Sequence, residues 1–364
     1  MKIKKALLEM SSESYADDNI QIPEDAVDCT LGCNPYGSVP GLLDVAKNAV
    51  VDMIYNYPHN QEIYEEIENY WKPYAQVGRD NIIIADGSIG ALDLIAEVFD
   101  ETGTSALSPA PTFTDATMAY KSRGIDYRYV AMRPGNGYAF DADELIAEID
   151  DMDSILYIDN PNNPTGQTIP LSDIEKIAAA GENKDVAVIV DEAYGDFIPS
   201  GESAVCLLDK FDNLIVVRTF SKAYGMAGMR AGYIIAEKSF CDNIRKMSDP
   251  YKMNELARRM GAEALRHGDF ALAHMDDFIK SKKMLRDVTG NKILMSVSDD
   301  RVPIALLWHV DPGFRLAAGL MENGVLAVDA WEFDCLGSNA VRLRVPRIEQ
   351  MEKVCEAVSK LNEG

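Results

Sequence analysis

Short apolar runs alternate with amphipathic stretches through the middle of the chain. Runs rich in β-branched residues predict buried strands at 81–85, 104–107, 127–132, 154–158, 186–190, 214–217 and 233–236. Stretches with helical spacing predict helices at 60–74, 91–99, 115–122, 143–149 and 171–180. Nearly continuous apolar strands that alternate with helices indicate an α/β fold, with a mostly parallel sheet between two layers of helices.

Both ends of the chain depart from this alternation. Before residue 60 the pattern predicts helices at 4–10 and 42–53, separated by a turn-rich segment at 28–37 and followed by an extended loop at 55–58. After residue 250 it predicts long helices at 252–267 and 270–285, strands at 293–297 and 304–310, and a last helix at 349–361. We therefore expect a large domain at 35–249 and a smaller α+β domain made of 1–34 and 250–364.

Composition and charge narrow the classes of function. With 364 residues, 47% hydrophobic and 26% charged, the chain has the profile of a soluble globular protein large enough for two domains. A net charge of −24 argues against nucleic acid or an anionic membrane surface as a partner. No apolar run approaches the roughly 18 residues of a membrane span, and the first ten residues lack the apolar core of a signal peptide.

Cysteine and histidine usage points away from a metal centre. The six cysteines are scattered without CxxC spacing, and the four histidines are isolated from one another. Free thiols in a reducing cytoplasm are therefore expected, with no metal bound.

One segment concentrates candidate chemistry, the stretch 218–232 that follows the strand at 214–217. It contains Ser221, Lys222 and, eight residues after the lysine, Arg230, in a loop of small residues that allows close approach of a ligand. A lysine beside another cation has a depressed pKa, and its neutral amine can attack a carbonyl to form a Schiff base. The alternative is a surface Ser-Lys pair in a glycine-containing turn.

Other strand ends carry polar or aromatic groups with similar alternatives. Asp191 could hold a protonated ring nitrogen or cap a helix, and Asn163, in a turn between two prolines, could donate to a ring oxygen or belong to a purely structural turn. Phe113 could stack on a planar ligand or fill the core. The loop 86–90 could seat a phosphate at a helix N-terminus or be an ordinary turn. Because ligands of parallel sheets bind beyond the carboxyl ends of the strands, we expect these groups to form one site.

Taken in order, the motifs resemble one family over nearly the whole chain. Asn-Pro-Tyr-Gly at 34–37, Tyr-Pro at 57–58, Pro-Asn-Asn-Pro-Thr-Gly at 161–166, Asp-x-x-Tyr at 191–194 and Arg-Thr-Phe-Ser-Lys-Ala at 218–223 are similar to those of fold type I pyridoxal-phosphate (PLP) enzymes. Among these, the chain resembles the class I/II aminotransferases, and within them the histidinol-phosphate aminotransferase-like branch. The resemblance implies the PLP-dependent transferase fold, PLP as cofactor and a homodimer with shared active sites.

The resemblance also implies roles for individual residues. Lys222 would form the Schiff base and move the proton, Asp191 would hold the ring nitrogen, Asn163 and Tyr194 would bond the ring 3-oxygen, and Phe113 would stack on the ring. Phosphate would be held by a larger set, namely Gly87, Ser88, Thr219, Ser221, Arg230 and, from the neighbouring subunit, Tyr57, and Ile89 would also contact the cofactor. Arg342 would bind the acidic group of an amino-acid substrate, with Tyr36 and Asn163 completing the substrate site.

The chain departs from this branch at the substrate end. Where histidinol-phosphate enzymes carry a second anion-binding arginine, this sequence has Val328, followed by Asp329. Arg344 or Arg347 could compensate, and Pro346 and Arg347 replace the usual glycine and threonine. A single carboxylate on an α-amino acid therefore fits the lone Arg342 better than the phosphate of histidinol phosphate. Transamination is the expected reaction, with a PLP-dependent lyase, decarboxylase or cyclase as the alternative and a ligand-binding regulatory domain as a more distant one.

Overall fold

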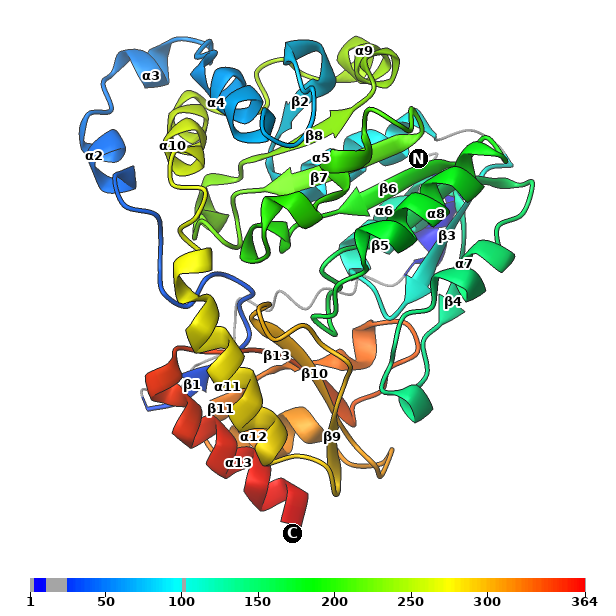
Figure 1. The fold of residues 1–364 in the computed structure, drawn as a ribbon, viewed down its shortest axis with the longest axis vertical. Coiled ribbons are helices and arrows are strands. Elements are labelled where there is room, and N and C mark those ends of the chain that lie inside the picture. The colour runs from blue at the N-terminus through cyan, green and yellow to red at the C-terminus, as the bar shows by residue number, and fades with distance from the viewer. Residues whose placement is uncertain (1–2, 11–24, 100–102, 364) are drawn as a thin grey trace.

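The computed structural model describes residues 3–10, 25–99 and 103–363, which form a large and a small unit (Figure 1). The large unit is built on a seven-stranded sheet in the order β2-β8-β7-β6-β5-β3-β4. Its strands are β2 (Ile82–Ala85), β3 (Ser105–Ala110), β4 (Asp126–Ala131), β5 (Asp153–Asp159), β6 (Ala187–Asp191), β7 (Leu214–Thr219) and β8 (Gly232–Ala236). Strands β4, β3, β5, β6 and β7 are parallel, whereas β8 runs antiparallel to β2 and β7. The predicted α/β fold with a mostly parallel sheet is confirmed.

Helices cover both faces of this sheet because successive strand residues point to opposite sides. In β6, Val188 and Val190 pack in the core with α4 (Glu62–Trp71), α8 (Leu171–Glu182) and α10 (Glu255–Leu265). Ile189 packs on the other face with α5 (Gly87–Val98), α6 (Thr114–Arg123) and α9 (Lys238–Met247). Both faces of the central strand β6 are therefore apolar, and its polar residue, Asp191, stands at its end.

Two predicted elements differ from the structure. The predicted helix at 42–53 is two short helices, α2 (Leu42–Lys47) and α3 (Asp52–Tyr55), because the chain leaves the helix at Asn48. The predicted loop at 86–90 is largely the first turn of α5, which already begins at Gly87. The backbone N–H groups of that turn have no partners within the helix and can bind an anion. Helix α9 was not predicted, since its sequence is mostly polar and buries only Cys241 and Ile244.

The small unit combines an antiparallel sheet with helices. Its sheet has the order β12-β13-β10-β9, with β9 (Ile293–Met295), β10 (Ile304–His309), β12 (Val328–Asp329) and β13 (Ala340–Arg344). Helices α11 (Met275–Asp287), α12 (Leu316–Glu322) and α13 (Met351–Glu363) enclose an apolar core that contains Leu285, Leu320 and Val354. Figure 1 shows these helices side by side at the C-terminal end of the molecule.

The predicted domain boundaries remain a prediction, and the packing adds detail to them. Helix α10 lies beyond residue 250 but packs on α4 and α2 beside the large sheet (Figure 1). Near the N-terminus, α1 (Lys5–Glu9) contacts α6 of the large unit, whereas β1 (Val27–Asp28) pairs with β11 (Val325–Leu326) of the small unit. Residues 1–2, 11–24 and 364 of the predicted small domain lie outside the described residues.

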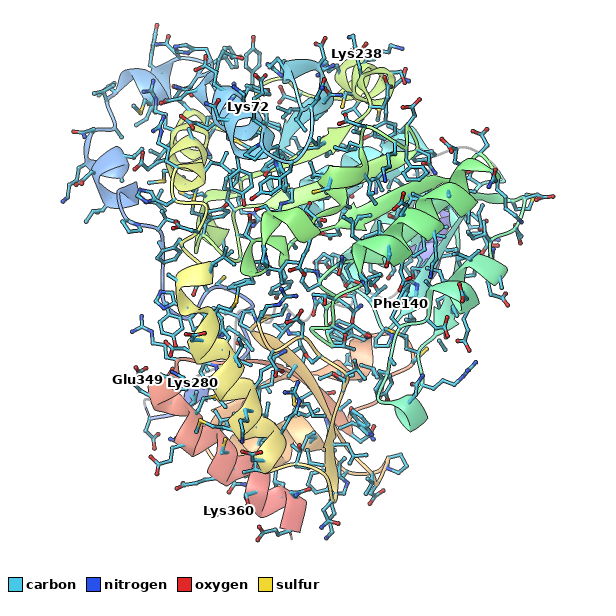
Figure 2. All side chains as sticks on the ribbon, in the orientation of Figure 1. Lys72, Phe140, Lys238, Lys280, Glu349 and Lys360 are labelled. Carbon is cyan, nitrogen blue, oxygen red and sulfur yellow. The ribbon has the colours of Figure 1, made fainter. Side chains whose placement is uncertain are left out.

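Charged side chains occupy the outer faces of the helices. Figure 2 labels several that are exposed there: Lys72, Lys238, Lys280, Glu349 and Lys360. All six cysteines are free thiols. Within residues 3–10, 25–99 and 103–363, no helix has the length and apolar character needed to cross a membrane, and no three His, Cys, Asp or Glu side chains are grouped to hold a metal ion.

Candidate active site

One cavity lies beyond the carboxyl ends of β5, β6 and β7 and encloses about 550 Å³, counted with its open mouth. It is lined by Ser88, Ile89, Phe113, Asp159, Pro161, Asn163, Asp191, Ala193, Tyr194, Ser221, Lys222, Ala227 and Arg230. The strand-end groups singled out from the sequence are therefore brought together. The parallel arrangement explains this, because adjacent strands deliver their following loops to the same edge of the sheet.

Lys222 sits in a braced loop with its amine in the cavity. The Lys222 carbonyl accepts from the Asn34 backbone N–H at 2.9 Å, and the Asn34 side-chain amide donates to the Ala223 carbonyl at 2.8 Å. The Lys222 Nζ lies 5.7 Å from the centroid of the Tyr194 ring. The Ser221-Lys222 pair is thus not part of a surface turn. The hydrogen bonds from Asn34 hold its backbone, and the Lys222 side chain lines the cavity.

Asp191 is a buried carboxylate at the end of β6. It accepts from the Tyr157 hydroxyl at 3.1 Å and from the Ala193 backbone N–H at 3.0 Å, and no α-helix begins after it. Burial, together with the charge of Asp159, raises the pKa of Asp191 to about 7. A protonated nitrogen placed against this carboxylate would favour its ionised form.

Two buried polar atoms in the cavity have no hydrogen-bond partner among the described residues. They are the Tyr194 hydroxyl and the Asn163 amide oxygen. Buried polar atoms are normally paired, so two such atoms in one cavity indicate a polar ligand. Gly32 lies against the same hydroxyl, and a Cβ at that position would collide with it and lie 3.3 Å from the Lys222 Nζ. The N-terminal loop, residues 30–34, therefore lies so close to Lys222 and Tyr194 that position 32 has no room for a side chain.

Gly87, Ser88 and Arg230 form a seat for an anion. Gly87 has a φ of 88° at the start of α5, and a Cβ there would lie 2.9 Å from Arg230 Nη2. Arg230 itself is left-handed, with a φ of 51°. Ser221 faces the cavity, whereas the Thr219 hydroxyl is directed to Ser221 Oγ at 3.0 Å and to the Ala231 carbonyl at 3.1 Å. The N-terminus of α5 and a guanidinium thus meet at one end of the cavity.

A buried ion network joins the loops that carry these groups. Arg218 of β7 donates to Glu192 Oε2 at 2.6 Å and also pairs with Asp196, and all three side chains are buried. The network links the loop after β6, with Asp191 and Tyr194, to the strand that leads to Lys222. Removing one partner of a buried pair leaves an uncompensated charge and is strongly destabilising, so all three side chains are needed to hold the two segments together.

Five predicted residues are not among those that line the cavity, namely Gly87 and Thr219, described above with the anion seat, and Tyr57, Tyr36 and Arg342. Tyr57 is 74% exposed, with its ring 4.5 Å from that of Tyr251. Tyr36 stacks on His274 at 3.9 Å between ring centroids and donates to Asp277 of α11. Arg342 is buried in β13 and donates to the Thr30 carbonyl, two residues before Gly32. The N-terminal loop therefore connects Arg342 to the lysine side of the cavity.

The structure adds four lining residues to which no role was assigned from the sequence: Asp159, Pro161, Ala193 and Ala227. Asp159 is the only one of them with a charged side chain. Its place at the end of β5, in register with Asp191 at the end of β6, is the signal that could have identified it.

Comparison with known proteins places the chain in a family. The model of the family "Aminotransferase class I and II" matches residues 34–358. The chain belongs to the aminotransferase class I and II family. It is 28% identical to histidinol-phosphate aminotransferase from Halorubrum lacusprofundi over 353 residues, which cover 96% of this chain and 92% of the relative.

Solved structures share the fold of this aminotransferase. Histidinol-phosphate aminotransferase from Clostridium acetobutylicum superposes with a TM-score of 0.80 at 20% identity, covering 93% of this chain and 99% of the other. The enzyme from Sinorhizobium meliloti, solved in complex with pyridoxal-5′-phosphate, gives 0.78 at 19% identity, covering 93% and 91%. The predicted fold type and the predicted aminotransferase activity are both confirmed, and the family implies PLP as cofactor.

Proposed function

We propose that this aminotransferase holds PLP through a Schiff base with Lys222 and transfers the amino group of a substrate whose acidic group binds Arg342. The observation that carries the proposal is the pair of unpartnered polar atoms, Tyr194 Oη and Asn163 Oδ1, in a cavity that also holds Lys222 and Asp191. The cavity offers a group for each part of PLP: the Tyr194 hydroxyl as a donor for the ring oxygen, the Asp191 carboxylate for the ring nitrogen, and the anion seat for the phosphate.

Each residue of the cavity would act on a different part of the cofactor. When bound, PLP supplies an electron sink for the bond broken at the substrate carbon. Asp191 would pair with the ring nitrogen, Phe113 would pack against the ring, and Ser88, Ser221 and Arg230 would hold the phosphate. The Lys222 amine would take a proton from the substrate carbon and return it, as a general base and acid.

Histidinol phosphate is the first substrate to test, because the relative from Halorubrum lacusprofundi carries that activity in its name and is matched over nearly its whole length. One observation favours a second candidate, an ordinary α-amino acid. Val328 is the register partner of Arg342, so an arginine at 328 would stand beside it, and this chain has none there. Arg344 donates to the Asp28 carbonyl, and Arg347 donates to the Pro35 carbonyl at 2.7 Å.

A substrate panel distinguishes these candidates. Purified holoenzyme is mixed with histidinol phosphate or with single α-amino acids, with and without 2-oxoglutarate, while cofactor absorbance and products are followed. Stoichiometric conversion to pyridoxamine phosphate by histidinol phosphate supports the first candidate, and conversion only by an amino acid supports the second. Turnover without any 2-oxo acid would instead point to a lyase, decarboxylase or cyclase.

We also propose that the protein forms a homodimer through the segment around α3. The segment around α3 exposes several apolar side chains, namely Val50, Val51, Ile54, Tyr55 and Tyr57, with Ile54 88% and Tyr55 84% exposed. Figure 1 shows α3 at the edge of the large unit. A contiguous exposed apolar patch of this kind marks an interface, and a second copy seated on it would bring Tyr57 toward the partner's phosphate seat. Light scattering at low concentration should give the dimer mass, and Ile54→Asp should give the monomer and weaken PLP binding.

A further inference from the structure

Asp159 makes four hydrogen bonds to two different loops. Its Oδ1 accepts from Thr112 Oγ1 at 2.8 Å and from Asn162 Nδ2 at 2.7 Å. Its Oδ2 accepts from the Phe113 backbone N–H at 3.2 Å and from the Asn163 backbone N–H at 2.9 Å. Each oxygen therefore takes one donor from the loop after β3 and one from the loop after β5.

This pattern uses the full capacity of a carboxylate, which has about four acceptor sites on its two oxygens. No neutral side chain of similar size can do the same, because an amide has only one acceptor atom. Asp159 is 3% exposed and burial raises its pKa to about 6, opposed by hydrogen bonds that include those from Asn163, Thr112 and Asn162. Such a group costs free energy to bury, and the four directed bonds offset that cost.

The loop after β3 carries Phe113, which would pack against the plane of the proposed cofactor ring. The loop after β5 carries Asn163, which would bond the ring oxygen. Phe113 and Asn163 both line the cavity, and the carboxylate holds the backbone N–H of each. We propose that Asp159 is a positioning residue that sets Phe113 and Asn163 in mutual register, and through them the tilt of the cofactor ring. This inference rests on the proposed PLP site and adds a residue to it that touches the cofactor only through its two neighbours.

A purely structural role is the competing explanation, and the same strand supplies a control. Asp153, at the opposite end of β5, is also buried and also joins β5 to β3, accepting from Ser105 Oγ at 2.7 Å and from the Asp150 N–H at 2.9 Å. It also pairs with Arg128. Asp153 thus has the same chemistry and strand partner, but it is remote from the cavity.

The test compares Asp159→Asn with Asp153→Asn. In Asp159→Asn the new Nδ2 must face either the two backbone N–H donors or the Thr112 and Asn162 donors, so each of the two loops loses one of its two bonds to residue 159. Both variants should lower the melting temperature. Only Asp159→Asn should weaken PLP binding to the apo-protein about tenfold or more, equivalent to about 1.4 kcal/mol, and change the circular dichroism of the bound cofactor.

A second readout needs no cofactor. In the apo-protein, amide hydrogen exchange of segments 111–116 and 160–166 should speed up about tenfold in Asp159→Asn and stay unchanged in Asp153→Asn. If wild-type protein fails to bind PLP, the proposed function fails, while the exchange data still decide the role of Asp159. Thr112→Val, which removes one donor without changing shape, should give a smaller shift in the same direction and serves if Asp159→Asn does not fold. Wild-type PLP affinity, dichroism and exchange in Asp159→Asn, or equal changes in Asp153→Asn, would overturn the inference.

Discussion

The cofactor half of the active site and its substrate half are built in different ways. The cofactor half, which includes Phe113, Asn163, Asp191 and Lys222, comes from loops that follow neighbouring strands of one sheet. The substrate half, around Arg342, brings together β13, β12 and the loop at 30–34. The first half follows from strand order alone, whereas the second depends on pairings between segments about 300 residues apart, such as Arg342 with Thr30, which are 312 apart.

This difference has a chemical counterpart. In the cofactor half, the Tyr194 hydroxyl and the Asn163 amide oxygen are unpartnered inside the cavity and Arg230 has a left-handed backbone, which are features of a site prepared for a ligand. In the substrate half, Arg344 and Arg347 both bond backbone carbonyls, and Asp329 accepts from the Trp331 N–H at 3.2 Å as a cap. Arg342 likewise donates to the Thr30 carbonyl, and its place beside Val328 and next to the loop that reaches Lys222 is what supports it as the proposed anion contact.

The largest effect is expected from Lys222→Ala, which removes the amine that defines the cofactor half. Activity should fall by about 10³-fold or more, and the visible band of the bound cofactor should disappear. Lys282 is the control, a fully buried lysine that donates to Ser298 Oγ and the Asp299 carbonyl outside the cavity. Borohydride reduction followed by peptide mass spectrometry should find the cofactor on Lys222; finding it on Lys282 would contradict the assignment.

The next effect concerns the two carboxylates of the cofactor half in the apo-protein. The folded-state pKa of Asp159 is raised to about 6 and that of Asp191 to about 7, above the ordinary aspartate value. Between pH 4 and 7 the unfolded chain has lost these two protons, whereas the folded chain still holds them. The free energy of unfolding should therefore fall by a few kcal/mol as the pH rises through this range.

Urea unfolding of apo-protein across this pH range measures the slope. Asp191→Asn should flatten it by removing one of the two groups, and bound PLP should flatten it as well, because a protonated ring nitrogen favours the ionised Asp191. A slope that Asp191→Asn leaves unchanged would show that other groups cause it.

In the substrate half, Arg342→Ala should raise KM about 30- to 100-fold with a smaller change in kcat, because a charge-assisted hydrogen bond worth about 2–3 kcal/mol is lost from substrate binding. Arg344→Ala is the comparison on the same strand, and its guanidinium bonds the Asp28 carbonyl. Steady-state kinetics with the substrate found in the panel checks both. An unchanged KM in Arg342→Ala would remove this residue from the substrate site.

The smallest effect is expected from Val328→Arg, which adds the missing second cation beside Arg342. It should lower KM for a phosphate-bearing amine about tenfold, through one added charge-assisted contact, and leave KM for a monocarboxylate amino acid nearly unchanged. Val328→Lys adds the same charge without the bidentate geometry and should help less. Equal effects on both substrate classes would mean that position 328 does not face the substrate.

Individual residues show which parts of the site could be predicted from the sequence and which could not. Lys222 and Arg230 were predicted from one loop, and Ser88 from a strand–turn–helix signal, because these features depend on local geometry. Asp159 was passed over, although it ends a predicted strand, because nothing in the sequence shows that its two oxygens reach the loop at 112–113. Helix α9 was missed for a different reason: Cys241 and Ile244 have helical spacing, but the mostly polar composition of the segment obscured this signal.

The sequence by itself determined the α/β fold, the family and the chemistry of the cofactor half, because strand periodicity and short-range spacing are encoded within a few residues. The tertiary structure alone decided that Val328 stands beside Arg342, that Gly32 closes against Lys222, and that Asp159 joins the loops of Phe113 and Asn163. The physical reason is that register and close approach depend on contacts between segments far apart in the chain, which no local pattern specifies.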